Sequence, residues 1–374
     1  MKKIILILIF LLLFMMTGGI AAGGISEKED IYAGQLHISG ADRLYDSLPD
    51  RVRSELSEMG ITGAEASSIA DLDIWSVFGE LFSSVREAFP APCSALGMCM
   101  GIMLICSLAD GTLEGASRTA GSLTGGLCIC TVLTVPLCSL LSRSAELIKS
   151  SAGFMELYIP VMSVLEAASG KELCASSYYS VLMAGCAVIG KIAESGFLPF
   201  MNILIALSVS SSMAQGLKLS SLFNSLFRIM KWMLVMLMSI FVTLLSAKTF
   251  VSSSLDRVSK RTLRIGVSSI VPVVGGVVSE TIAAFSGSIA LLKNGVGVFA
   301  VIAVGVLFLP VLVECLLWRG ALAVLSSAAE ILNTGGQEVI FKSLNSVCAM
   351  LMALLICILI LFVISTVIIL LVGT

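Results

Sequence analysis

The chain has 374 residues, of which 57% are hydrophobic and 13% charged, with a mean hydropathy of +1.03. Ordinary soluble domains carry about a quarter charged residues, so this composition excludes that class and predicts a membrane protein. The single histidine, His37, argues against a catalytic metal centre, and the sparse basic residues argue against nucleic-acid binding. We therefore expect no cofactor, no metal and no catalytic residue, and we interpret the protein as non-enzymatic.

The amino-terminal segment has the pattern of a secretory signal. Two lysines precede an apolar run over residues 4–16, and small residues follow up to Gly24. This run of 13 residues is shorter than the roughly 20 that a spanning helix needs. The sequence predicts a signal peptide over residues 1–23, with an uncleaved anchor as the alternative. In both cases the region that follows faces out of the cytoplasm.

Residues 24–89 form an acidic region with 13 acidic and 5 basic residues, a net charge of −8. Short helices are predicted by two apolar stripes, one of which recurs every fourth residue at Leu44, Leu48, Val52 and Leu56. The region is too small to bury much core alone. We interpret it as an extracytoplasmic segment that docks a partner or lies at the membrane interface.

The remainder, 90–374, has 12 acidic and 16 basic residues and contains long apolar runs. Eight of these runs, given at the end of this paragraph, are compatible with spanning helices. A ninth, 154–168, is short and contains Pro160, and it is interpreted as a segment that re-enters the membrane. Amphipathic stretches at 216–231, 250–264 and 319–342 are expected to lie in the interface. The fold class is thus predicted to be an all-α polytopic membrane protein with about eight spanning helices. The predicted spans are residues 92–108, 121–141, 178–192, 197–213, 230–247, 265–285, 296–317 and 346–372.

Two halves of this membrane part resemble each other in the positions of their prolines. The first half runs from one proline to the next in 39 residues and the second in 38, and each carries a glutamate after its first proline. We predict a first transmembrane hairpin over 90–150, a first repeat over 151–264 and a second over 265–374. The repeats are inverted if each has an odd number of spans. The residues predicted to break helices are Pro160, Pro199, Pro272, Gly275, Gly276 and Pro310.

Ionisable residues at membrane depth are costly unless they are paired or hydrated, and they often mark a functional path. Glu166, Glu280 and Glu314 are such residues, and with Lys293 and Asn294 they form the candidate polar path. The alternative is that each glutamate lies near a helix end or pairs with a lysine or arginine. That alternative is favoured for Glu166, and the partners considered are Lys171, Lys293 and Arg319.

Small residues and basic clusters give two further predictions. Gly97, Gly101, Gly121 and Gly125 are spaced to let the first two membrane helices approach closely. The dense basic cluster at 248–264 is placed in the cytoplasm, which requires residues 154–168 not to cross the membrane.

The order of these elements resembles a known family. The residues that carry the resemblance are Val271-Pro-Val-Val-Gly-Gly276 and Ser288-Ile-Ala-Leu-Leu-Lys-Asn-Gly-Val-Gly297, with Tyr158-Ile-Pro-Val-Met162 and Phe308-Leu-Pro310 in comparable places. Together with the signal and the external helical region, they resemble the stage III sporulation protein AE family over roughly residues 90–372.

The resemblance implies a role in endospore formation. Proteins of that family lie in the mother-cell membrane around the forespore, as one component of a channel or secretion-like complex that links the two cells. The implied partners are the sibling stage III sporulation A proteins, AA to AH, and the forespore-side Q protein. The resemblance brings no catalytic residue with it.

These observations lead to one leading hypothesis and two alternatives. The leading hypothesis is a multi-pass conduit core of that complex, which passes small molecules or a protein across the mother-cell membrane. The first alternative is a membrane scaffold that assembles the sibling subunits and transports nothing. The second is a stand-alone secondary transporter.

Overall fold

The structure, a computed structural model, describes residues 39–61, 83–112, 116–168, 172–213, 221–239, 275–332 and 334–372, with the single positions 63, 79 and 243. Every regular element in these residues is helical, and six helices are long and apolar enough to cross a membrane. The predicted class, an all-α polytopic membrane protein, is therefore confirmed. The labelled elements are α3 (Asp42–Asp46), α4 (Asp50–Glu58), α7 (Pro90–Thr112), α8 (Ala116–Ala168), α9 (Glu172–Ile192), the π-helical turn η1 (Ala193–Phe197), α10 (Leu198–Met213), α12 (Gly275–Ile331) and α13 (Gly335–Val372). A further helical stretch, Ser221–Ser239, is one of the six candidate spans.

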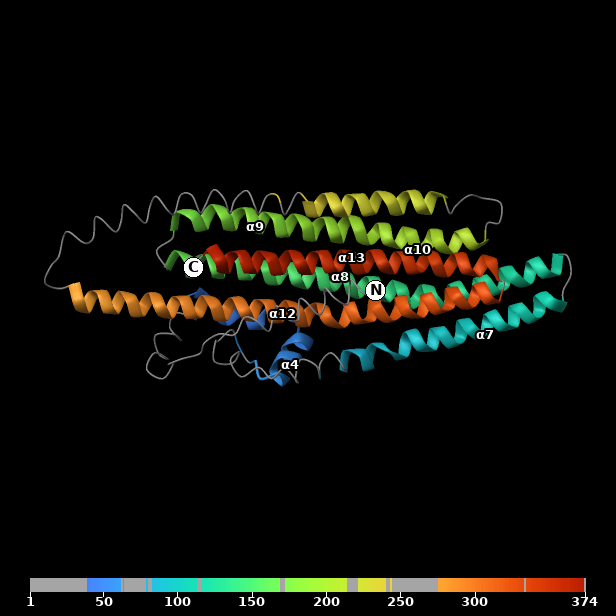
Figure 1. Ribbon diagram of the computed structural model, residues 1–374, viewed down its shortest axis with the longest axis horizontal. Coiled ribbons are helices and arrows are strands. Elements are labelled where there is room, and N and C mark those ends of the chain that lie inside the picture. The colour runs from blue at the N-terminus through green and yellow to red at the C-terminus, as the bar shows by residue number, and fades with distance from the viewer. Residues whose placement is uncertain are drawn as a thin grey trace.

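The helices are much longer than the apolar runs that predict them. α8 has 53 residues and α12 has 57, which at 1.5 Å per residue correspond to about 80 and 85 Å. They run side by side along an elongated bundle (Figure 1). The hydrocarbon core of a bilayer is only about 30 Å thick, so neither helix fits within it.

These lengths change the predicted spans. The runs 121–141 and 154–168 lie on one helix, α8, so the second continues the first and does not re-enter. The runs 178–192 and 197–213 form one helical stretch through η1. The stretch 319–342, predicted to lie in the interface, includes the end of α12, the turn that follows and the start of α13. Charges that end an apolar run do not end these helices, because Lys, Arg and Glu are good helix formers. The predicted signal at 1–23 and the basic cluster at 248–264 lie outside the described residues.

The helices also continue through prolines that were expected to break them. α8 contains Pro160 and α12 contains Pro310, because a proline removes one hydrogen bond but a helix packed on both sides can bend and continue. Pro199 is the second residue of α10, just after the π-helical turn η1, so the helix geometry is irregular immediately before it. Pro272 is outside the described residues, and the pair of glycines at 275 and 276 begins α12.

The proline spacing is not matched by a repeated secondary structure in the described residues. Between residues 160 and 199 one helix ends at Ala168 and another begins at Glu172. The corresponding stretch of the second half, from Gly275 to Pro310, is uninterrupted helix. The predicted boundary at residue 150 also falls within α8. The two repeats stay a prediction from the sequence.

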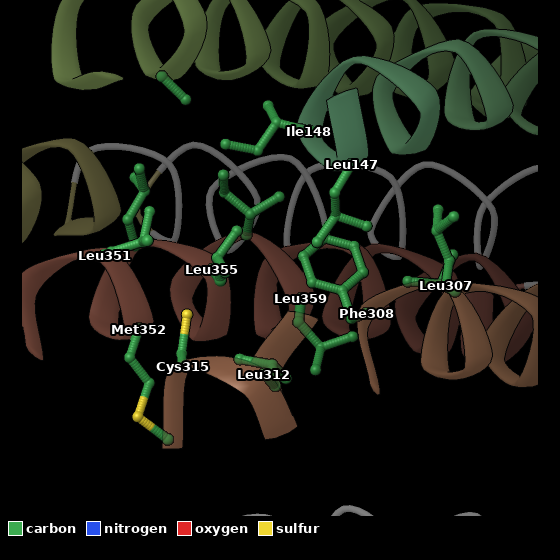
Figure 2. Close-up of a cluster of buried hydrophobic side chains, with 14 of the residues drawn as sticks. Leu147, Ile148, Leu307, Phe308, Leu312, Cys315, Leu351, Met352, Leu355 and Leu359 are labelled. Carbon is green, nitrogen blue, oxygen red and sulfur yellow. The ribbon is translucent and has the colours of Figure 1, made fainter. Parts of the chain in front are cut away.

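α12 and α13 form an antiparallel hairpin whose register is fixed by three contacts. Lys342 Nζ is 2.7 Å from Glu330 Oε1, Arg319 Nη1 is 3.6 Å from Met352 Sδ, and the rings of Phe308 and Phe362 are 6.5 Å apart. From one contact to the next, the residue number falls by 11 on α12 and rises by 10 on α13, as expected for two antiparallel helices in a constant register. Figure 2 shows the centre of the packing, where α8 meets this hairpin. The labelled side chains are Leu147 and Ile148 of α8, Leu307, Phe308, Leu312 and Cys315 of α12, and Leu351, Met352, Leu355 and Leu359 of α13.

The first apolar stripe predicted in the acidic region is confirmed. Leu44, Leu48, Val52 and Leu56 are all buried, and α3 and α4 pack against α8 and α12 respectively. α4 ends at Glu58, and Gly60 follows with a φ of 82°, which lets the amide of Ile61 donate a hydrogen bond to the carbonyl of Leu56. This small region therefore gains a core by packing against the long helices of the same chain.

Candidate functional site

A buried ion pair joins two of the long helices. Glu166, near the end of α8, lies with Oε1 3.1 Å from the Nζ of Lys293 on α12. The two side chains are 3% and 6% exposed. The hydroxyl of Tyr179 on α9 donates a hydrogen bond to the other carboxylate oxygen of Glu166. Three helices thus meet at one carboxylate, and both of its oxygens have a partner.

Helical periodicity explains why these charges point inward. Met155, Ile159 and Met162 precede Glu166 on the buried face of α8 at spacings of three and four residues. Lys293 likewise lies on the buried face of α12, one turn before Val296. A charge at such a core position is tolerable only when it is paired and hydrogen-bonded, which is the arrangement observed.

A second ion pair joins the same two helices farther along. Arg143 Nη2 of α8 is 2.5 Å from Glu314 Oε1 of α12. The Glu314 side chain is 6% exposed and that of Arg143 is 52% exposed, so the pair is open to one side. The pairs are separated by 23 residues on α8 and 21 on α12, about 32–35 Å of helix. α8 and α12 are thus antiparallel and are linked by charge at two distant points.

The five residues of the candidate polar path do not come together. Glu166 and Lys293 pair, whereas Glu314 lies about 32 Å farther along α12. Asn294 is exposed, whereas the adjacent Lys293 is buried. Glu280 lies on α12, and its side chain is outside the described residues. Within the described residues, no three His, Cys, Asp or Glu side chains are grouped so that they could hold a metal ion.

Sequence reasoning named Lys293 among the possible partners of the three glutamates without assigning it to Glu166, and it missed Tyr179 and Arg143. Arg143 lies 171 residues before Glu314 in the chain, and only the register of α8 against α12 brings them together. A tyrosine within an apolar run gives no signal of its role. A single sequence therefore indicates which charges need partners, but not which partners they have.

The four glycines predicted to pack helices differ in their surroundings. At Gly125 of α8 an added Cβ would lie 2.1 Å from Cys106 Sγ of α7 and 3.1 Å from Gln337 Nε2 of α13, so three helices approach closely there. At Gly97 and Gly101 nothing lies within 4 Å of an added Cβ in the described residues. These two glycines lie on an exposed face of α7, so the predicted close packing is not found there. Gly121 is half-buried.

Comparison with known proteins identifies the family. The family model described as stage III sporulation protein AE matches residues 64–373. A protein named stage III sporulation protein AE from Bacillus subtilis (strain 168) is 26% identical over 161 residues, which are 43% of this chain and 40% of that relative's length. No solved structure matches the chain. Because the family model matches most of the sequence, the chain belongs to the stage III sporulation protein AE family.

Proposed function

We propose that the protein is a non-enzymatic, multi-pass membrane component of a channel or secretion-like complex between mother cell and forespore, and that its helical bundle is the rigid framework of that component. The observation that carries the framework role is the double ion-pair link between α8 and α12, Glu166–Lys293 and Arg143–Glu314. Family membership supports the sporulation role. The proposed partners are the sibling A proteins, AA to AH, and the forespore-side Q protein.

The state of the charges favours a framework over a path through the bundle. A residue that lines a conduit must be hydrated or exchange partners, whereas Glu166 is 3% exposed and has partners on both oxygens. Large apolar side chains, including Phe299 and Phe308, fill the core between the two ion pairs and are fully buried. Packing of this kind fixes the distance between helices and leaves no role for a mobile charge.

The proposed location is the mother-cell membrane around the forespore, with the acidic amino-terminal region outside the mother-cell cytoplasm. In this arrangement α3 and α4 lie on the same side as the partners that reach across from the forespore. The exposed charges of α4, including Arg51 and Glu58, supply a polar surface for them.

The test compares single and double substitutions at the buried pair in the native spore-forming host. The framework proposal expects that Glu166→Gln combined with Lys293→Met leaves assembly with sibling subunits and heat-resistant spore formation near normal. The reason is that a buried ion pair can be replaced by neutral side chains of similar volume without loss of stability. Lys293→Met alone should lower protein abundance, assembly and sporulation together.

Abundance in the membrane is the control for each variant. If the double variant is abundant and assembled but forms no spores, the charges themselves are needed and the framework proposal fails. That result would support a conduit that uses this pair.

A conduit is the second candidate function, and the half-exposed Arg143 favours it. Its guanidinium group is accessible from one side while it neutralises Glu314. A polar route would then pass along the surface of α8 and α12, between this chain and its partners. Arg143→Gln with Glu314→Gln should abolish transport in an assembled complex if the route uses this pair, and full sporulation of that variant would exclude it.

A further inference from the structure

In one half of the bundle the helices have long stretches without a charged residue, and charged residues lie at both ends of these stretches. α8 has no charged residue over positions 119–142, and the stretch 88–109 leading through α7 has none either. These stretches of 24 and 22 residues span about 33–36 Å, close to the thickness of the hydrocarbon core. α10 also contains no charge. In Figure 1 these three segments occupy the right half, together with the end of α12 and the start of α13.

The outer surface of this half is apolar. Large hydrophobic side chains are exposed on α7, on the first part of α8 and on α10, where no other described part of the chain covers them. Two of the most exposed, Leu108 and Val135, have 74% and 71% of their surface free. Others on the same three helices are Met98, Ile105, Leu127 and Ile203, each between 43% and 69% exposed. A surface of this kind and thickness fits lipid chains.

The other half has a different surface. Beyond Arg143, α8 exposes Glu146, Lys149 and Glu156. The polar helices α3 and α4 also lie against this half, since the rings of Tyr45 and Phe299 are 6.4 Å apart and α4 packs on α12. Hydrocarbon around this half would have to enclose all of these charges, which is costly.

The apolar residues that α12 contributes to this second half are inside the protein, whereas Leu157 and Val164 of α8 and Val188 of α9 are about half exposed. On α12, Val296, Phe299, Ala303 and Phe308 are each at most about 1% exposed. They pack against α8 and α13, so their hydropathy reflects a protein core. High hydropathy therefore does not by itself place this part of α12 in lipid.

We propose that the bilayer surrounds only the half of the bundle formed by α7, residues 119–142 of α8, α10, residues 315–331 of α12 and the start of α13, and that the half containing Glu166 and Lys293 projects from the membrane. Arg143 and Glu314 then lie at the boundary. Arg319 lies about one turn from this boundary on the bilayer side, where its long side chain can extend toward the headgroups. The run 154–168, predicted to re-enter the membrane, and residues 296–314 of the predicted span 296–317 would then belong to the projecting stalk and not to lipid-embedded helix. This inference concerns depth and does not depend on the framework role.

Two leucines on α8 provide a matched test in the full-length protein. Leu127 and Leu157 lie on the same helix and are 43% and 46% exposed, but they fall near the middle of the uncharged stretch and of the proposed stalk respectively. Leu127→Lys should reduce membrane-inserted protein at least tenfold, because a lysine would face hydrocarbon at its centre. Leu157→Lys should leave the amount within about twofold of the parent, as for a surface substitution in water.

The reverse order, or loss of both variants, would overturn the proposal, and so would normal insertion of both. A second measurement does not depend on a variant failing to insert. Glu156→Cys and Val135→Cys, in a background without the native cysteines, are treated in opened membrane vesicles with a membrane-impermeant maleimide. Position 156 should react within minutes and position 135 only after detergent is added. Protection of position 156, or reaction of position 135 without detergent, would show that lipid does not surround the proposed half and would overturn the proposal.

Discussion

Lys293→Met should be among the most destabilising single substitutions in this protein. It removes the cation that faces Glu166 at 3.1 Å and leaves a carboxylate with 3% exposure in the core. Breaking a buried pair in this way costs about 3–5 kcal/mol, roughly a 10² to 10⁴-fold change in the folded-to-unfolded ratio. The remaining bond from Tyr179 satisfies only one oxygen of the carboxylate.

The measurement is a denaturation curve of the full-length protein in mild detergent, followed by loss of helix signal. Adding Glu166→Gln to Lys293→Met should recover most of the loss, because no charge is then left unpaired. Lys191→Met is the matched control, since this lysine on α9 is exposed, and it should change stability by no more than about 0.5 kcal/mol. If the double variant is as unstable as the single one, unpaired charge is not the cause and the reasoning is refuted.

Three further predictions test other contacts by the same denaturation measurement. Gly125→Ala should cost about 1–3 kcal/mol by overpacking, because the added Cβ would lie 2.1 Å from the sulfur of Cys106. The double variant with Cys106→Ala should regain stability. If it does not, a different contact limits the site. Phe308→Ala should cost about 3–5 kcal/mol, since this fully buried ring leaves a cavity against α13, and a cost below about 1 kcal/mol would contradict the packing. Arg143→Ala should cost less than Lys293→Met, about 1–3 kcal/mol, because the arginine is half exposed while Glu314 is buried; an equal or larger cost would show that exposure does not weaken this pair.

Local patterns in the sequence predict the parts of the fold that depend on neighbours three or four residues apart. The stripe of Leu44, Leu48, Val52 and Leu56 predicts both the helices and their buried face, and all four side chains are buried. What they pack against could not be predicted, because the contact with α8 and α12 joins residues far apart in the chain. The region was expected to dock a partner or lie at the membrane interface, and in the structure α3 and α4 dock onto the long helices of the same chain.

Helix length was the main feature that hydropathy could not predict. A window of about 19 residues finds apolar runs and treats the charges between them as loops. Arg143 and Arg319 interrupt such runs, yet α8 and α12 continue through both of them. A charge near a bilayer boundary and a charge in a loop look the same in sequence. The structure shows that both helices continue through these charges.

The sequence predicts that the buried charges have partners of opposite charge, but it does not predict which residues those partners are. Glu166 was expected to be paired because an isolated carboxylate in an apolar helix is costly, and it is paired. Lys171, Lys293 and Arg319 were all compatible with that expectation. The choice among them depends on which helix lies beside α8 and in what register, and neither is encoded by local spacing.

The two ion pairs also account for why α8 and α12 adopt this register. The faces between the pairs are mostly apolar side chains, and such faces can pack at several offsets of one turn with a modest change in buried area. A slide of α12 by one turn, about 5.4 Å, would separate Lys293 from Glu166 and Glu314 from Arg143 at the same time. Three of these four side chains would then be buried charges without partners, and the cost would far exceed any gain from repacking. Apolar packing thus supplies most of the stability of the bundle, while the ion pairs select one offset from those that the packing allows.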